Sequence, residues 1–322
     1  MRSSSASKII DAGMADDTRS IARLISLIED ADPQVPELLR DLPRPAKNPY
    51  VVGLTGAPGV GKSTTTSALI AHWREQQARI AVLAVDPSSP FTGGALLGDR
   101  VRMQSHATDD QVFIRSMASR GHLGGLAAAT PQAIRVLEST GFDCVLVETV
   151  GVGQAEVDVA AMADTTVVLL APGMGDGIQA AKAGLLEVAD VLVVNKADRD
   201  GADDALRELR HMISTVTDRQ PGAWRPPVVR AVATAEGGIA ELVEAIEKHR
   251  AWLASSGEGE RRRLARAAHE IRSLALALLT KQLGLRLDDP RLMSLASEVV
   301  SGSIDAFTAA QQLAGKVGAS PL

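Results

Sequence analysis

The chain has 322 residues, of which 45% are hydrophobic and 23% are charged, a composition typical of soluble globular proteins rather than disordered or fibrous ones. Its 34 basic and 39 acidic residues give a net charge of −5, so we expect neither nucleic acid nor an anionic membrane as a partner. The single cysteine, Cys144, excludes an internal disulfide framework and a cysteine-based zinc site. Residues 1–15 contain no apolar leader, and no run of about 18 apolar residues follows, which predicts a cytoplasmic protein.

Residues 1–47 are expected to form an N-terminal helical extension. The start of the chain is Ser-rich and aperiodic, but Ile21, Leu24, Ile25 and Ile28 then follow one another at helical spacing. Asp and Thr residues immediately before them are suited to capping a helix. Prolines end the pattern before the next segment begins.

Residues 48–254 contain seven short apolar runs that alternate with longer amphipathic stretches. Aromatic residues make up only 2% of the chain, and a core poor in rings suits buried parallel strands covered by Ala-rich helices. We therefore expect an α/β fold with a doubly wound, mainly parallel seven-stranded sheet, whose carboxyl strand ends share the edge at which such sheets bind ligands. The expected strands are Val51–Thr55, Ile80–Val85, Val112–Ile114, Cys144–Val147, Thr166–Leu170, Val191–Val194 and Val228–Val232.

Residues 255–322 are expected to form a C-terminal helical arm. A Ser-Ser-Gly break at its start precedes an apolar stripe that runs from Leu264 to Leu278 at helical spacing. Asp289 and Pro290 start a second helix, and Ser303 is expected to cap a third. An arm of two or three helices is too thin to hold a core alone, so it either folds back on the sheet domain or pairs with another copy.

Arg261, Arg262 and Arg263 form the one local concentration of positive charge that we single out. We interpret them as a solvated helix start beside Glu258 and Glu260, in preference to a binding patch.

The segment Gly56-Ala57-Pro58-Gly59-Val60-Gly61-Lys62-Ser63-Thr64 contains the Walker A pattern, between an expected strand and an expected helix. Its glycines allow backbone N–H groups to turn toward phosphates at a helix N-terminus. Lys62 is predicted to neutralise the β- and γ-phosphate oxygens, and Ser63 to bind Mg²⁺. A glycine turn with a surface lysine is the alternative, which the flanking strand and helix disfavour.

Two carboxylates that could complete a magnesium site follow expected strand ends, namely Asp86 and Glu148. Each alone is as often a helix cap or turn former, but the Walker A segment favours the metal interpretation. Asp99 lies in a long polar connection between two strands, and connections of that length are usually functional. It is a further candidate for the metal or for a water, with an ordinary surface residue as the alternative.

The loop after Glu148 is expected to act as a switch, in which the Gly151 N–H reaches the γ-phosphate and releases it after hydrolysis. Hydrolysis also needs a positioned water, and no feature decides among Asp86, Asp99 and Gln154 for that role. The full set of catalytic candidates is Lys62, Asp86, Asp99, Glu148 and Gln154. An arginine finger is open between Arg100, Arg115, Arg120 and a partner protein.

Asn195-Lys196-Ala197-Asp198 follows an expected strand and forms an N-K-x-D pattern. Asp198 can accept two N–H bonds from the N1 and N2 edge of guanine, while Asn195 braces the loop and the Lys196 stem packs along the base. Adenine offers neither donor, and sites built on such bonds discriminate by roughly 10⁴ or more. A capped helix start explains Asp198 equally well by itself, so the preference for GTP over ATP rests on the Walker A segment and Glu148 as well.

These motifs together resemble the MeaB/ArgK family within the SIMIBI class of P-loop GTPases, and the resemblance covers nearly the whole chain. The strings that carry it are Gly56–Thr65, Val85–Gln104, Val147–Ala155, Ala171–Leu185 and Asn195–Arg199. The resemblance implies a GTP-hydrolysing chaperone that assists adenosylcobalamin loading, protection or reactivation of methylmalonyl-CoA mutase or a related acyl-CoA mutase. It also implies a homodimer formed through the C-terminal helices.

The same resemblance implies a third switch over Gly173–Lys182, with Asp176 and Lys182 as its polar members. Spacing alone indicates only an ordinary loop and helix start there.

Three alternatives remain open. Similar sequences have been named transport-system kinases, but a kinase needs a base and a pocket for a second substrate, and no such element is evident. A nickel metallochaperone GTPase shares the motif layout, but it needs clustered His or Cys ligands, whereas the six His residues here are scattered. A purely structural nucleotide-binding scaffold is the third.

Overall fold

The computed structural model describes residues 17–30, 32–45, 48–87, 103–106, 108–119, 129–149, 155–173, 186–216, 222–283 and 289–315. The chain divides into two compact units, residues 1–264 and residues 265–322. The first unit contains the sheet, and the described part of the second contains helices. None of the helices within the described ranges combines the length and the apolar character needed to cross a membrane.

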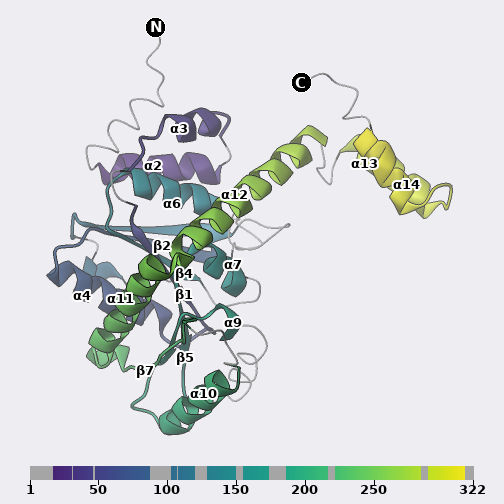
Figure 1. The fold of residues 1–322 in the computed structure, drawn as a ribbon. Coiled ribbons are helices and arrows are strands. Elements are labelled where there is room, and N and C mark those ends of the chain that lie inside the picture. The colour runs from purple at the N-terminus through teal and green to yellow at the C-terminus, as the bar shows by residue number, and fades with distance from the viewer. Residues whose placement is uncertain are drawn as a thin grey trace. The chain divides into compact units, whose positions relative to one another are not determined.

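The sheet confirms the predicted α/β architecture (Figure 1). Seven strands lie in the order β3-β2-β4-β1-β5-β6-β7, and every neighbouring pair is parallel. Their carboxyl ends therefore share one edge, with β1 at the centre between β4 and β5. The strands are β1 (Tyr50–Thr55), β2 (Ile80–Pro87), β3 (Val112–Ser119), β4 (Cys144–Thr149), β5 (Thr165–Leu170), β6 (Val191–Val194) and β7 (Val228–Arg230).

Strands β2 and β4 each run two residues past the predicted ends, and the two edge strands, β3 and β7, also differ from the prediction in length. Strand β3 continues past Ile114 because Arg115, which ended the apolar run, is paired with Glu29 and with the Ser26 hydroxyl. Strand β7 ends at Arg230, two residues early, because Val232 leaves the sheet and forms an antiparallel bridge with Gly237.

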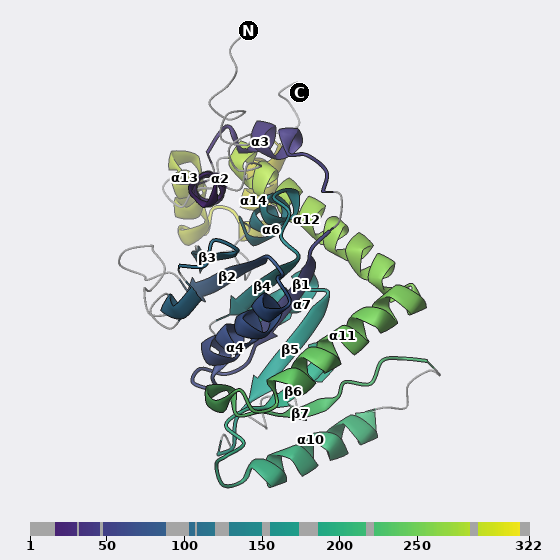
Figure 2. The ribbon, with the colours of Figure 1, turned by 90° about the vertical axis from the view of Figure 1, so that its left-hand side faces the viewer.

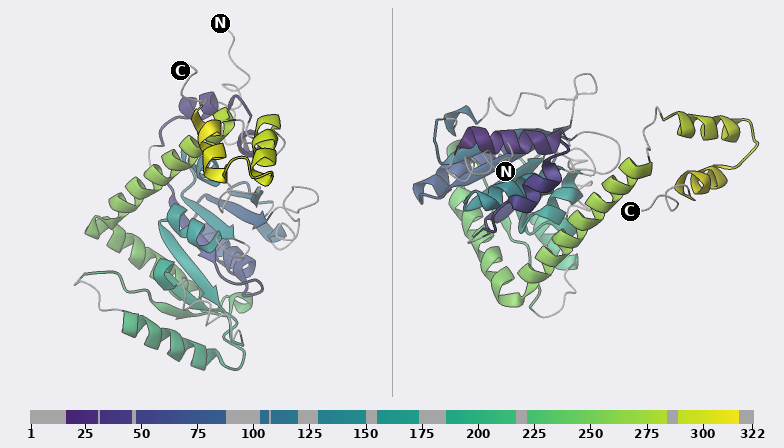
Figure 3. Two further views of the ribbon diagram at one scale, coloured as in Figure 1. Left: turned by 90° about the vertical axis from the view of Figure 1, so that its right-hand side faces the viewer. Right: turned by 90° about the horizontal axis from the view of Figure 1, so that it is seen from above.

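Helices cover both faces of the sheet. Helices α4 and α11 pack side by side on one face (Figure 2). The opposite face carries α2, α3, α6, α7 and α10, of which α7 and α10 lie toward the viewer in the left panel of Figure 3. The bounds are α2 (Thr18–Glu29), α3 (Val35–Asp41), α4 (Lys62–Glu75), α6 (Ala129–Ser139), α7 (Ala155–Met162), α9 (Leu186–Val188), α10 (Ala202–Val216), α11 (Ile239–Ser256) and α12 (Glu258–Leu283), with 3-10 turns η1 (Gln104–His106) and η3 (Ala233–Ala235).

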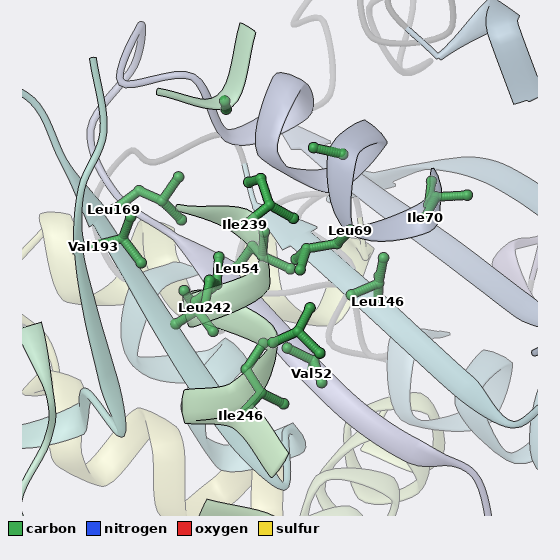
Figure 4. Close-up of a cluster of buried hydrophobic side chains, with 14 of the residues drawn as sticks. Val52, Leu54, Leu69, Ile70, Leu146, Leu169, Val193, Ile239, Leu242 and Ile246 are labelled. Carbon is green, nitrogen blue, oxygen red and sulfur yellow. The ribbon is translucent and has the colours of Figure 1, made fainter. Parts of the chain in front are cut away.

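The core follows the two-residue period of the central strands. Val52 and Leu54 of β1 point to the α4 and α11 side, where they meet Leu69 and Ile246 (Figure 4). Val51 points to the other side and joins the cluster beneath α2 and α6. Both faces of β1 are buried, as an apolar strand in the middle of a parallel sheet requires.

The predicted N-terminal helix is α2, which begins at Thr18. The side chain of Asp17 caps it by accepting hydrogen bonds from the N–H groups of Arg19 at 3.1 Å and Ser20 at 3.2 Å. All four apolar residues of the predicted stripe are buried, and the helix packs on α6 and β3. Helix α2 is therefore part of the core of the first unit.

In the second unit, α13 (Pro290–Val300) and α14 (Ala306–Gly315) contact each other. Asp289 caps α13 through the Arg291 N–H, as the Asp-Pro pair predicts. The expected cap at Ser303 is wrong, because Asp305 accepts the N–H groups of Phe307 and Thr308 instead.

The interpretation of the arginine triplet as a solvated helix start holds for Arg261 but is wrong for Arg262. Arg261 is exposed and pairs with Glu258, as expected for a solvated helix start. Arg262 turns toward the sheet, where its guanidinium binds the buried carboxylate of Asp190. Sequence spacing could not reveal this contact, because the two residues are 72 positions apart.

Candidate functional site

The phosphate loop lies between β1 and α4, and its shape depends on glycines. Gly56, Gly59 and Gly61 have φ values of 141°, 78° and 98°, which residues other than glycine rarely adopt. A Cβ at Gly56 would lie 2.2 Å from the Leu169 carbonyl oxygen of β5. A Cβ at Gly61 would lie 2.3 Å from Nδ2 of Asn195. The loop is thus packed directly against the ends of β5 and β6.

Helix α4 begins at the loop, with Gly61 as its N-cap and Lys62 as its first residue. The Lys62 ammonium donates hydrogen bonds to the carbonyl oxygens of Gly56 at 2.6 Å and Ala57 at 3.0 Å. The side chain is buried, so a fixed positive charge lies within the loop at a helix N-terminus. Such a combination attracts phosphate groups.

Glu148 at the end of β4 joins this loop to the centre of the sheet. The Ser63 hydroxyl donates to its Oε1 at 2.7 Å, and the Thr66 hydroxyl donates to its Oε2 at 2.8 Å. Only 3% of the Glu148 surface is exposed. A serine hydroxyl beside a carboxylate is a set of hard oxygen donors, which fits Mg²⁺. Part of the predicted metal set therefore lies together, while Thr66 was not singled out from the sequence.

The N-K-x-D segment lies against the other side of the phosphate loop. Asn195 is buried, its Nδ2 donates to the Val60 carbonyl oxygen at 2.8 Å, and its Oδ1 accepts the Ala233 N–H at 3.1 Å. Lys196 adopts a left-handed backbone with φ of 56° and donates from Nζ to the Gly59 carbonyl oxygen at 2.5 Å. The base-reading motif and the phosphate loop thus form one hydrogen-bonded assembly.

Asp198 is exposed at the same edge of the sheet, where its carboxylate is accessible to a ligand. The backbone of its turn is held by the Ala197 N–H, which donates to the Ala231 carbonyl oxygen at 3.0 Å. The turn η3 after β7 borders the site through Ala233. Sequence analysis missed η3, because its small residues form no recognised pattern and only their position after β7 marks them.

Several predicted residues cannot be placed in the site. Asp86 belongs to β2, but its side chain is not among those that the structure describes. The residues Asp99, Gly151, Gln154, Asp176 and Lys182, the last two from the expected third switch, lie outside the described ranges. The same holds for the arginine-finger candidates Arg100 and Arg120. Arg115 is placed, and its guanidinium is engaged by Glu29 and Ser26 of α2.

Metal-ligand clusters bear on the nickel alternative. Within the described ranges, no group of three or more His, Cys, Asp or Glu side chains is arranged to hold a metal ion. Cys144 is buried, and burial raises the pKa of its thiol well above the usual range.

The substitution Gly61→Ala tests the close packing of the loop. It forces a left-handed alanine, at about 1–2 kcal/mol, and displaces the Asn195 amide, which removes a hydrogen bond worth about 1 kcal/mol. We expect GTP affinity to fall by about 30- to 100-fold in a calorimetric titration. Gly59→Ala is the control, because its φ is also positive but nothing lies within 4 Å of the added Cβ. Equal losses in the two variants would contradict the assigned contact.

Comparison with known proteins supplies the family. Residues 21–285 match the family described as methylmalonyl-CoA mutase-associated GTPase MeaB. A protein of Pyrococcus abyssi whose name calls it a GTPase is 44% identical over 307 residues, which are 95% of each chain. The GTPase ArgK of Escherichia coli K12 is 39% identical over 246 residues, or 74% of each chain.

Two further relatives widen the comparison. The mouse protein named methylmalonic aciduria type A homolog, mitochondrial, is 41% identical over 211 residues, which are 65% of this chain and 51% of the mouse protein. A crystal structure described as LAO/AO transport system kinase superimposes with a TM-score of 0.69 at 26% identity, covering 99% of both chains. The chain is therefore a GTP-binding, GTP-hydrolysing P-loop protein, and it belongs to the MeaB family of methylmalonyl-CoA mutase-associated GTPases.

Proposed function

We propose that this GTPase is a chaperone of adenosylcobalamin-dependent methylmalonyl-CoA mutase, which it assists in cofactor loading, protection or reactivation. The observation that carries the proposal is the family match over residues 21–285, whose description names that mutase. The similarity to the mouse methylmalonic aciduria protein points to the same metabolic context. In this proposal, GTP hydrolysis at the nucleotide site supplies the energy for the chaperone cycle and sets its timing.

In the proposed nucleotide complex, the backbone from Gly56 to Thr64 surrounds the phosphates and Lys62 neutralises the β- and γ-oxygens. Ser63 would bind Mg²⁺, and Glu148, whose Oε1 accepts the Ser63 hydroxyl at 2.7 Å, would hold the metal or one of its waters. We assign further metal or water contacts to Asp86 and Asp99, and the γ-phosphate contact to Gly151. Gln154 stays a candidate, with Asp86 and Asp99, for positioning the attacking water.

Guanine specificity is assigned to Asp198, with Asn195 and Lys196 as its supports. The Asp198→Asn substitution removes one of two acceptors and places a donor against the guanine N–H edge. We expect GTP affinity to fall by roughly 10² or more, while xanthosine triphosphate, whose C2 carbonyl accepts that donor, binds more tightly.

Competition between labelled GTP and unlabelled nucleotides measures this specificity. Asp200→Asn is the matched control, because Asp200 is also exposed in the turn and the same charge is removed. GTP affinity that is unchanged in Asp198→Asn would show that another residue reads the base.

The mutase partnership is tested with purified adenosylcobalamin-dependent methylmalonyl-CoA mutase. We expect a stable complex whose affinity differs between GTP and GDP, and GTP hydrolysis that is at least about tenfold faster in the complex. Gel filtration and phosphate release measure the two effects. In Ser63→Ala, which lacks the proposed metal ligand, the nucleotide dependence should disappear. Absence of a complex in both nucleotide states would refute the mutase assignment.

A homodimer through the C-terminal helices is the second part of the proposal. Large apolar side chains are exposed on these helices, including Ile271 at 68%, Leu278 at 60% and Phe307 at 73%. Apolar exposure on this scale marks interaction surfaces. Pairing with another copy would remove these side chains from water.

Light scattering tests the dimer. We expect wild-type protein at twice 33.7 kDa and the Ile271→Asp/Leu278→Asp variant at 33.7 kDa, because a buried, unpaired carboxylate opposes association. Arg272→Asp, at an exposed neighbouring position, is the control and should stay dimeric. A monomeric wild type would contradict the proposal.

The transport-system kinase remains a second candidate, favoured by the description of the structurally similar crystal structure. Incubation with γ-labelled GTP and periplasmic binding proteins separates the two. Label on a protein favours the kinase, and free phosphate alone favours the chaperone.

A further inference from the structure

A cluster of polar side chains is buried at the amino edge of the sheet, opposite the nucleotide site. We call Tyr50, Thr165, Asp190, His249 and Arg262 the Asp190 cluster. Thr165 and His249 are fully buried, and Asp190 is 4% exposed. The members come from β1, β5, the turn before β6, α11 and the first turns of α12. The nucleotide mechanism uses none of them.

Arg262 is the cation that balances the buried Asp190 carboxylate. Its Nη1 donates to Oδ2 and its Nη2 to Oδ1, both at 2.8 Å, in a two-pronged pair. Nη1 also donates to the Asp164 carbonyl oxygen at 3.0 Å, and Oδ2 of Asp190 accepts the Thr166 N–H at 2.9 Å. The first turns of α12 are thereby tied to the starts of β5 and β6.

His249 is a second side chain that could pair with the Asp190 carboxylate if it were protonated. Its Nε2 lies 3.3 Å from Asp190 Oδ1, yet it is buried and makes no hydrogen bond to any residue that the structure describes. Burial is the main cause that lowers the pKa of His249 to about 4, and Arg262 lowers it further while Asp190 opposes the shift. While Arg262 is docked, His249 is therefore neutral at physiological pH.

The hydroxyls behind His249 can serve either protonation state. Thr165 Oγ1 lies 2.6 Å from His249 Nδ1 and 2.5 Å from the Tyr50 hydroxyl. With neutral His249, Tyr50 donates to Thr165 and Thr165 donates to Nδ1. With protonated His249, Nδ1–H donates to Thr165, which donates to Tyr50. Both arrangements keep the hydrogen bonds between His249 and Thr165 and between Thr165 and Tyr50, because a hydroxyl can reverse its role.

We propose that the Asp190 cluster is a proton-coupled latch on the first turns of α12. In its closed state Arg262 is docked on Asp190 and His249 is neutral. In its open state Arg262 has withdrawn, and His249 has taken one proton from solvent at Nδ1. The ring is then positively charged, and its Nε2–H donates to Asp190. The charge of the buried site is the same in both states, so opening leaves no unpaired carboxylate.

The surrounding charges do not replace His249 in this role. Asp164 before β5, Arg250 on α11 and Glu258 on α12 also face the cluster, and Glu258 accepts from Arg262 Nε at 3.3 Å. The Tyr50 hydroxyl has a pKa raised above its usual range, mainly by burial. Among these side chains only the imidazole has an ordinary pKa near neutrality.

The Arg262→Met substitution opens the latch permanently. We expect the pKa of His249, followed by NMR of ¹⁵N-labelled imidazole, to rise by at least about one unit, which is a tenfold gain in proton affinity. Hydrogen exchange of residues 257–264 should accelerate at least about tenfold, while GTP affinity stays unchanged. Arg261→Met is the control, since Arg261 is exposed and pairs with Glu258, whereas Arg262 binds Asp190. An unchanged His249 pKa in Arg262→Met would overturn the latch.

The pH dependence of the free energy of unfolding distinguishes the latch from a simple loss of packing. In wild type the folded-state pKa of His249 lies below the ordinary 6.5, so unfolding takes up a proton and stability rises with pH between about 4 and 6.5. In Arg262→Met this pH dependence should weaken or reverse. When His249→Asn is also present, Arg262→Met should no longer alter the pH dependence. Failure of Arg262→Met to fold at about pH 5.5, where His249 should supply the charge, would also contradict the proposal.

Discussion

The amide of Asn195 is the interaction on which the nucleotide site depends. It joins three segments that are distant in sequence: its own turn after β6, the phosphate loop through Val60, and the start of η3 through Ala233. Its backbone N–H also donates to the Leu170 carbonyl oxygen of β5 at 2.8 Å. Nδ2 lies so close to Gly61 that a side chain at this position would clash with it. The phosphate loop can therefore approach the N-K-x-D segment this closely only with a glycine there.

The parallel register supplies the rest of the geometry. Val52 pairs with Leu146 of β4 on one side of β1 and with Thr165 of β5 on the other. The ends of β4, β1 and β5 are therefore held at one level, so that Glu148 reaches the helix that follows the phosphate loop. Two hydroxyls one helical turn apart on α4, those of Ser63 and Thr66, meet the two oxygens of that carboxylate. A rigid helix and a buried strand thus fix the candidate metal ligands.

How much of the structure the sequence could predict depends on how far apart in the sequence the residues of each contact are. The strands and the phosphate loop are local patterns, and all seven strands appear where apolar runs predict them. Thr66, by contrast, was unremarkable in sequence, because its role depends on a carboxylate 82 positions away. The Ala233 N–H is a backbone group and carries no residue signal at all. The arginine triplet has equal charge at each position, and only the direction in which α12 begins selects Arg262 for Asp190.

The amino edge of the sheet shows why a buried ion pair can be present without adding much stability. Removing Arg262 and Asp190 from water costs several kcal/mol for each ion, and their attraction repays little more than that. An apolar pair of similar volume would hold α12 about as firmly. What the planar guanidinium adds is direction, because two parallel N–H bonds fix the angle as well as the distance. The same carboxylate also accepts the N–H of Thr166, the second residue of β5, so the first turns of α12 are held by the strand frame that carries the nucleotide motifs at its other end.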